Sequence, residues 1–210
     1  MKSNTKQLTA LAMCTTLSYL VMVFGRIPVW GFLSFDPKDA VLALVVLLFG
    51  LAPGLMITFM VCLIEMITVS STGILGMIMN FIASAAFIIP IGLLVKNNSS
   101  NNKTLIAFVF STIVMTAIML LWNMLITPIY MNVPRSEVMG MLLPIILPFN
   151  LLKGFGNSAL IFLFVPHLNR IREVIGIEIV TKKEEKNILS YIIALGLFLA
   201  SIAIYFLILK

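Results

Sequence analysis

Charged side chains are scarce in this sequence. Asp, Glu, Lys and Arg make up 10% of its 210 residues, whereas hydrophobic residues make up 61% and the mean hydropathy is +1.14. This composition excludes a soluble globular domain of any size and is typical of an integral membrane protein. The net charge of +6 does not indicate a nucleic-acid partner, because the basic residues lie at the ends of apolar runs, where they act as topology signals.

Motifs for catalysis, nucleotide binding and metal binding are also missing. The two cysteines, Cys14 and Cys62, both lie in apolar segments and imply neither a disulfide framework nor a metal site. No G-x-x-x-x-G-K-[ST] motif is present, so the chain does not bind nucleotide through a P-loop. The single histidine, His167, has neither an H-E-x-x-H motif nor an acid cluster around it. The sequence therefore predicts a protein that is not an enzyme and that uses no metal or cofactor.

Seven apolar segments predict an all-α integral membrane protein. A span needs about 20 residues, and the segments are 8–25, a short two-helix hairpin within 40–70 that is split at Ala52-Pro53-Gly54, 73–95, 104–126, 142–166 and 188–209. We expect residues 1–170 to form a six-helix binding domain, 171–187 a charged cytoplasmic linker, and 188–210 an additional C-terminal transmembrane helix. Nine Lys and Arg residues fall in segments that would be cytoplasmic and four in outside segments, which predicts a cytoplasmic N-terminus.

One apolar segment, Leu142–Pro166, carries polar side chains along one face. Asn150, Lys153 and Asn157 are three and four residues apart, so they stack on one side of a helix. A lysine near the middle of a membrane helix costs about 3 kcal/mol, so Lys153 should face protein or a water-filled cavity. Two interpretations are open: a binding face, or an ion pair with a buried acid such as Glu65 that only holds helices together.

The segment Arg26–Asp39 connects the first two apolar runs and mixes aromatic side chains with charges. Its prolines and glycine break a helix. We expect a long irregular loop that covers a site as a mobile lid, because such loops often carry function. The alternative is that aromatic residues such as Trp30 only anchor the chain at the membrane interface.

The remaining polar residues indicate a binding site. A few amides, one lysine and one acid among aromatic residues suit a small, largely apolar molecule held by a few directed hydrogen bonds. Asparagine offers both a donor and an acceptor, which complements an imide or amide edge. Asn123 is a further candidate, with a helix–helix hydrogen bond as its alternative role.

Several segments resemble the substrate-binding S component of energy-coupling factor (ECF) vitamin transporters, specifically the riboflavin-specific branch. They are Ala10-Leu11-Ala12-Met13-Cys14-Thr15, Leu33-Ser34-Phe35-Asp36-Pro37-Lys38-Asp39, Phe49-Gly50-Leu51-Ala52-Pro53-Gly54, Trp122-Asn123 with Pro128-Ile129-Tyr130, and Leu147-Pro148-Phe149-Asn150-Leu151-Leu152-Lys153-Gly154 with Asn157. Together they cover most of residues 8–170, and the last is the most specific. The seventh apolar segment departs from the six-helix core of the family.

The resemblance implies a plasma-membrane protein that captures riboflavin from outside and docks on a transmembrane coupling subunit carrying two ATPases. Asn123, Asn150 and Lys153 would hydrogen-bond riboflavin, and the loop would cover it. Trp30, Trp122 or Phe149 would flank its flat ring. The full set of binding candidates is Asn123, Asn150, Lys153, Glu65, Asn157, Trp122, Phe35 and Asp36. The small residues Ala10, Ala12 and Cys14 would meet the coupling subunit, because small side chains let helices approach closely in lipid.

Three readings of the function are open from the sequence. Besides a riboflavin-binding subunit, the chain fits an S component for another vitamin. It also fits a non-transporting membrane subunit whose polar residues only lock helices together. A membrane enzyme acting on lipid is disfavoured, because no acid–base cluster is visible.

Overall fold

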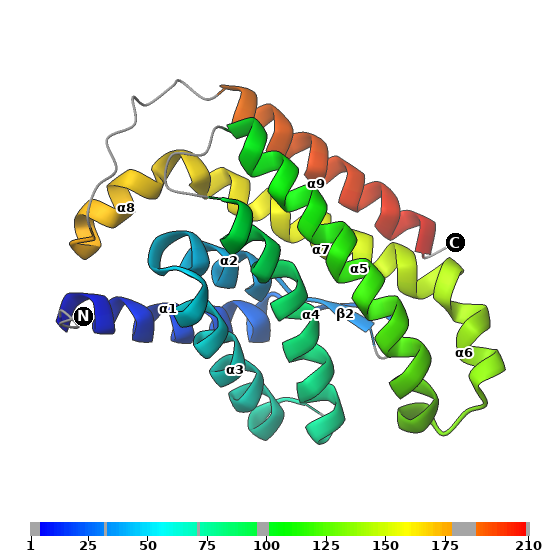
Figure 1. Ribbon diagram of the computed structural model, residues 1–210. Coiled ribbons are helices and arrows are strands. Elements are labelled where there is room, and N and C mark those ends of the chain that lie inside the picture. The colour runs from blue at the N-terminus through cyan, green and yellow to red at the C-terminus, as the bar shows by residue number, and fades with distance from the viewer. Residues whose placement is uncertain (1–4, 32, 71, 96–100, 178–187, 209–210) are drawn as a thin grey trace.

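The computed structural model describes residues 5–31, 33–70, 72–95, 101–177 and 188–208. It is a helical bundle with one small two-stranded sheet, β1-β2 (Figure 1). The elements are α1 (Thr5–Phe24), β1 (Ile27–Trp30), β2 (Leu33–Phe35), α2 (Lys38–Phe49), α3 (Leu51–Thr68), α4 (Gly73–Leu94), α5 (Asn101–Met131), α6 (Arg135–Met141), a π-helical turn (Leu142–Ile146), α7 (Leu147–Phe164), a 3-10 turn (Val165–His167), α8 (Leu168–Ile175) and α9 (Ile188–Ile208). The all-α membrane fold predicted from the composition is confirmed.

Five of the described stretches are long and apolar enough to cross a membrane: Thr5–Phe24, Leu51–Thr68, Gly73–Leu94, Asn102–Met131 and Arg135–Ile175. The described part of α9 adds a shorter apolar helix, Tyr191–Phe206. Together with α2, these make up the seven apolar segments expected from the sequence, within the part of the chain that the structure describes. α2 is shorter than a span, because its 12 residues extend only about 18 Å at 1.5 Å per residue.

The predicted short hairpin is present, but the chain turns before the predicted break. Gly50 adopts φ +91° between α2 and α3, a conformation that favours glycine. Pro53 then lies in the first turn of α3, where its missing N–H has no intrahelical partner to lose. The two helices approach so closely that a Cβ on Gly54 would clash with the Val46 side chain.

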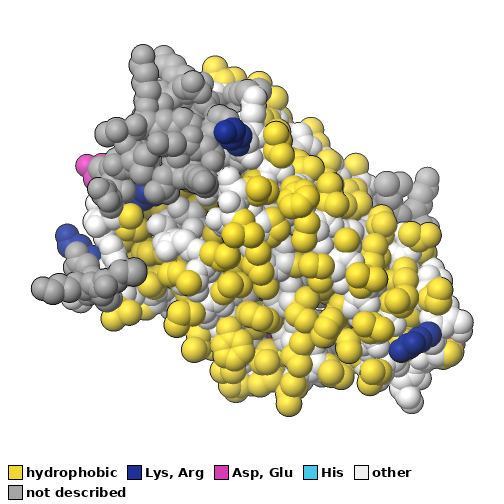
Figure 2. Space-filling model, viewed as in Figure 1, with side chains coloured by type: hydrophobic (Ala, Val, Ile, Leu, Met, Phe, Trp, Pro, Cys, Tyr) yellow, Lys and Arg dark blue, Asp and Glu magenta, His cyan; other side chains and the backbone are white. Residues whose placement is uncertain are grey.

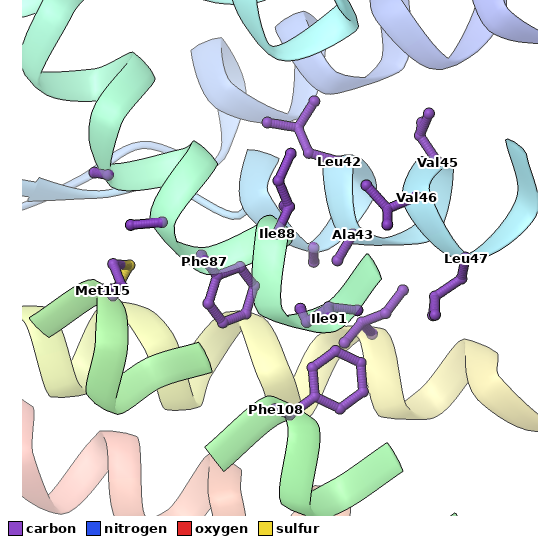
Figure 3. Packing of buried hydrophobic residues seen from close by; sticks show 14 of the residues in the cluster. Leu42, Ala43, Val45, Val46, Leu47, Phe87, Ile88, Ile91, Phe108 and Met115 are labelled. Carbon is purple, nitrogen blue, oxygen red and sulfur yellow. The ribbon is translucent and has the colours of Figure 1, made fainter. Parts of the chain in front are cut away.

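The hydrophobic core is centred on α2. Buried side chains of α2 belong to one hydrophobic cluster with side chains of α4, α5 and α7. In Figure 3, Leu47 of α2 points to the side where Ile91 of α4 and Phe108 of α5 lie, whereas Leu42 and Val45 point to the other side of α2. The outer surface shown in Figure 2 is mainly hydrophobic, unlike the surface of a soluble protein. Hydrophobic side chains cover most of the face in Figure 2, and the few visible charges lie near its margins. This distribution is what a lipid environment requires.

The segment after α1 is ordered differently from the expected irregular loop. Its residues form an antiparallel hairpin in which Ile27 pairs with Phe35, Pro28 with Ser34 and Trp30 with Leu33, with a register shift between Pro28 and Trp30. Its turn includes Gly31 at φ +49°. Val29 is buried while its neighbours are exposed, which is the alternation of a half-buried strand. The expectation of irregular structure was wrong. The strand has only four residues, and an alternation that short cannot be recognised in the sequence.

The segment after α7 continues as predicted into a charged, amphipathic stretch. In α8, Arg172 is buried, and its guanidinium donates a hydrogen bond of 2.8 Å to the carbonyl of Leu47 in the last turn of α2. Most of the predicted linker, residues 178–187, lies outside the described residues. Beyond it, α9 packs along α7 on the side of the bundle away from α1 (Figure 1).

Candidate functional site

A polar pocket lies among the β-hairpin, α3, α4, α5 and α7. Its empty space is about 820 Å³, including the part open to solvent. The lining residues are Arg26, Leu33, Ser34, Asp36, Glu65, Ser70, Thr72, Gly76, Met79, Asn80, Ala83, Met119, Asn123, Tyr130, Phe149, Asn150 and Lys153. Apolar side chains and hydrogen-bonding groups therefore share one concave surface.

The polar face of α7 is buried, as its spacing predicts, but its residues differ in what they contact. Asn150 and Lys153 line the pocket, and they are 2% and 5% exposed. The Asn157 amide is engaged with the backbone instead. Its oxygen accepts a bond of 2.8 Å from Ala40 N–H, and its nitrogen donates to the carbonyls of Asp36 (3.2 Å) and Lys153 (2.9 Å). Asn157 thus fastens the start of α2 to α7 from behind the pocket.

Lys153 forms its ion pairs with the segment that joins the hairpin to α2. Its Nζ lies 3.5 Å from Asp36 Oδ2 and 3.4 Å from Asp39 Oδ2. Asp39 Oδ1 also accepts a hydrogen bond from the Ser84 hydroxyl on α4. The alternative pairing of Lys153 with Glu65 is therefore not the one the structure shows.

Glu65 is the centre of a second charged group. Lys38 Nζ lies 2.6 Å from Glu65 Oε2, Asn80 Nδ2 donates a bond of 3.0 Å to Glu65 Oε1, and Arg26 Nη1 lies 3.9 Å from the same oxygen. Lys38 is completely buried, whereas the Arg26 side chain is 33% exposed at the edge of the pocket. Glu65 therefore connects α3 to α2, to α4 and to the residue before the hairpin.

The two groups together balance their charges. They contain three cations and three carboxylates: Arg26, Lys38, Lys153, Asp36, Asp39 and Glu65. Asp36 lies between β2 and α2, outside the spanning helices. Burial raises the pKa of its carboxyl, but the neighbouring cations, Lys153 first, lower the pKa below its ordinary value. Because each buried ion is compensated, the pocket presents no net charge to a ligand.

The amides of Asn123 and Asn150 are partly free to bind. Asn123 Nδ2 donates 2.7 Å to Met119 O, and its Oδ1 accepts 2.8 Å from the Thr127 hydroxyl. Asn150 Nδ2 donates 2.8 Å to Ile146 O. An amide nitrogen carries two hydrogens, so each side chain keeps one N–H. The Asn150 side chain also carries Oδ1, an amide oxygen that can accept hydrogen bonds. These groups supply donors and an acceptor on facing helices.

Three aromatic residues named from the sequence have different positions. Phe149 is buried and lines the pocket. Trp122 does not line it; this side chain packs against the main hydrophobic cluster, and its Nε1 is buried without a hydrogen-bond partner among the described residues. Phe35 lies on the outer side of the hairpin against α7, where a Cβ on Gly156 would lie 2.8 Å from its ring. Of the three, Phe149 is the one placed to contact a pocket ligand.

Sequence reasoning missed four residues of the two charged groups: Arg26, Lys38, Asp39 and Asn80. The sequence did contain a signal for the first three. They lie in the charged segment Arg26–Asp39, and the buried charges of Lys153 and Glu65 need partners of opposite sign. No local pattern identifies Asn80, which is placed by the packing of α3 against α4.

The small residues of α1 do not share one surface. Ala12 is exposed, whereas Ala10 and Cys14 are half-buried and Cys14 packs against the main hydrophobic cluster. Thr16, four residues after Ala12, is also exposed. The outward face of α1 therefore carries Ala12 and Thr16, and Cys14 points toward the bundle.

A comparison with protein families matches residues 6–165 to "ECF transporter, substrate-specific component". A curated relative, the "Riboflavin transporter FmnP" of Bacillus subtilis (strain 168), is 27% identical over 162 residues, which cover 71% of this chain and 84% of the relative. A solved structure described as "Structure and mechanism of the S component of a bacterial ECF transporter" is similar with a TM-score of 0.66 and 25% identity. That likeness covers 80% of this chain and 97% of the other.

Proposed function

Since the chain belongs to the family of ECF transporter substrate-specific components, we propose that it captures riboflavin from outside the cell and delivers it to an ATP-driven partner module. Members of this family bind the substrate of a transporter and are not enzymes, and they work with an ECF membrane subunit and ATPases. The chain is accordingly a multi-pass membrane protein. We propose three specific points beyond family membership: the ligand is riboflavin, the protein lies in the plasma membrane, and its N-terminus is cytoplasmic.

One observation carries the choice of ligand: amides of α5 and α7 meet across a pocket that has no net charge. The isoalloxazine ring of riboflavin is a flat tricycle with an imide edge, and its ribityl chain carries hydroxyls. The remaining N–H groups of Asn123 and Asn150 and the Asn150 amide oxygen match an imide edge. The ring would lie against Phe149 and Met119.

The balanced charges support an uncharged ligand. A ligand with a carboxylate or phosphate would call for a cation in excess, and each cation of the pocket already has a carboxylate within 4.0 Å. The curated relative, named a riboflavin transporter, supports the same ligand.

Among the binding candidates, the geometry supports different roles. Asn123, Asn150 and Lys153 would contact the ligand, and Asp36 and Glu65 would hold the cations in place at the wall. Asn157, Trp122 and Phe35 would act from outside the pocket, through backbone contacts and packing. Docking on the ECF membrane subunit would use the outward face of α1, where Ala12 is exposed, while Ala10 and Cys14 would set how closely α1 packs on the bundle.

Mild purification tests the ligand directly. The purified protein should be yellow, with a flavin absorption spectrum, and mass spectrometry of the denatured sample should identify riboflavin. A protein purified from riboflavin-fed cells that contains another vitamin would replace riboflavin with that compound. A protein that releases no small molecule and takes up no added riboflavin would favour a subunit whose polar residues only lock helices.

A further inference from the structure

The helix α9 lies beyond the residues that match the family, 6–165, yet it packs along the helix that carries the binding face. The two sides of α7 line different spaces. Asn150 and Lys153 face the pocket, whereas Leu152, Gly156 and Leu160 line an apolar groove toward α9. In Figure 1, α9 runs along α7 over most of its length. α9 is therefore placed behind the wall of the site.

The inward side of α9 has residues that allow close packing. Ala194 and Ser201 are 2% and 7% exposed and lie seven residues apart, on one side of the helix. Ser201 meets α7 where that helix has no side chain, since a Cβ on Gly156 would lie 3.8 Å from Ser201 Cβ. The Ser201 hydroxyl donates 2.7 Å to Phe198 O within α9. Small residues of this kind let helices approach in lipid.

The last turns of α9 reach the β-hairpin. Tyr205 and Ile208 pack against a second hydrophobic cluster, which contains Val29 and Leu33 of the hairpin together with Val138, Ile146 and Phe149. Phe149 and Leu33 also line the polar pocket. One layer of side chains therefore separates α9 from the ligand space.

An apolar groove leaves the rest of the outer side of the hairpin uncovered. Its empty space is about 990 Å³, including the part open to the surroundings, and the hairpin contributes Ile27, Val29 and Phe35 to its wall. The opposite wall includes Ile202 and Tyr205 of α9. A two-stranded hairpin is marginally stable by itself, so its few contacts on this side should strongly affect how often it opens.

We infer that α9 positions the β-hairpin over the pocket, with Tyr205 as the main positioning residue, and thereby sets how long the pocket stays closed. The part of the inference that concerns ligand lifetime rests on the proposed function. The part that concerns the hairpin does not, because it is a property of the ligand-free protein.

The test measures hydrogen exchange of the wild type and of variants in α9, each as the 210-residue protein without ligand in lipid nanodiscs. Tyr205→Ala should speed exchange of the backbone amides in 27–35 by about tenfold, since loss of half-buried aromatic packing shifts the opening equilibrium by about that factor. Tyr205→Phe, which keeps the ring, should restore the slow exchange. Leu199→Ala, at an outward-facing residue of α9 that is 56% exposed, is the matched control and should leave exchange unchanged.

Tyr205→Ala could speed exchange simply by loosening the whole bundle, so a second variant is needed whose expected effect on the hairpin has the opposite sign. Ile202→Phe adds bulk inside the groove and should slow exchange of the hairpin amides. Equal hairpin exchange in Tyr205→Ala, Ile202→Phe and the wild type would overturn the inference. So would faster exchange in Tyr205→Ala that extends equally to α4 with no slowing in Ile202→Phe.

The rate of riboflavin dissociation, measured by stopped-flow displacement, tests separately whether α9 controls the lifetime of the bound ligand. The dissociation rate should rise in Tyr205→Ala by about the factor seen in hairpin exchange. Altered exchange with an unchanged dissociation rate would overturn control of ligand lifetime by α9. Absence of riboflavin binding in the wild type would instead overturn the proposed function, and the exchange experiment would still decide the role of α9.

Discussion

The ion pair between Lys38 and Glu65 is the shortest among the described residues, and its removal tests what the charges of the pocket do. Lys38 Nζ lies 2.6 Å from Glu65 Oε2, and the two residues are 0% and 3% exposed. Glu65→Gln leaves a buried ammonium group without this partner. We expect it to lower the free energy of unfolding by about 3–5 kcal/mol, the usual cost of an uncompensated buried charge.

The opposite single variant should cost less. In Lys38→Met the Glu65 carboxylate keeps its hydrogen bond from Asn80 at 3.0 Å and the nearby Arg26 guanidinium at 3.9 Å. We expect a loss of about 1–3 kcal/mol. The double variant has no unpaired charge at this position and should recover most of the stability, because neutral replacements of a buried pair are often well tolerated.

The assay is reversible unfolding of the purified protein in mixed micelles for the wild type, both single variants and the double variant. A coupling energy of about 3 kcal/mol or more is expected from the cycle, because the two single losses sum to about 4–8 kcal/mol and the double variant should lose little. Arg135→Met, at an exposed residue in the first turn of α6, is the control and should change stability by less than about 0.5 kcal/mol. Single-variant effects that simply add, within about 0.5 kcal/mol, would refute the view that the pair acts as a unit.

Three further predictions concern binding, closure and transport. Asn150→Ala should weaken riboflavin binding by roughly five- to a hundredfold in calorimetric titration while the protein stays folded, because a buried hydrogen-bonding group is lost; unchanged affinity would contradict its place in the site. Riboflavin should slow deuterium exchange of residues 27–35, and equal exchange with and without it would remove the role of the hairpin as a lid. Ala12→Leu should abolish uptake by cells that contain the ECF partners but keep binding by the purified protein, whereas Leu199→Phe should affect neither; a parallel loss of binding would place Ala12 in the packing of the bundle.

The face of α7 could be predicted because it depends on local geometry. Asn150, Lys153 and Asn157 recur at helical spacing, and a lysine in an apolar helix must be buried against protein or water. The same reasoning found Glu65 as a buried acid. It could not find which acid pairs with which lysine, because Asp36 and Asp39 reach Lys153 only after the hairpin folds back onto the bundle.

The hairpin and α2 show why other features escaped prediction. The hairpin strands have four and three residues, too few for alternation to stand out among prolines and aromatic residues. The sequence places residues 40–49 in the short hairpin of apolar segments, because a short membrane helix and a buried core helix have the same composition. Tertiary packing distinguishes these cases, and packing is not visible in a single sequence.

The short helix α2 is anchored at both of its ends. At its start, Lys38 and Asp39 belong to the charge groups of the pocket, and Ala40 N–H donates to Asn157. In its last turn, the Leu47 carbonyl accepts the hydrogen bond from Arg172 of α8. Between the two anchors lie three turns of helix with buried side chains and no internal break.

This arrangement makes α2 a strut about 18 Å long. A continuous helix neither stretches nor bends easily over such a length, so its two ends move together or one anchor breaks. A displacement of Lys38 and Asp39 would therefore be transmitted along α2 to Leu47 and its hydrogen bond with Arg172 of α8. The shortness that disqualifies α2 as a membrane span is what gives it this stiffness.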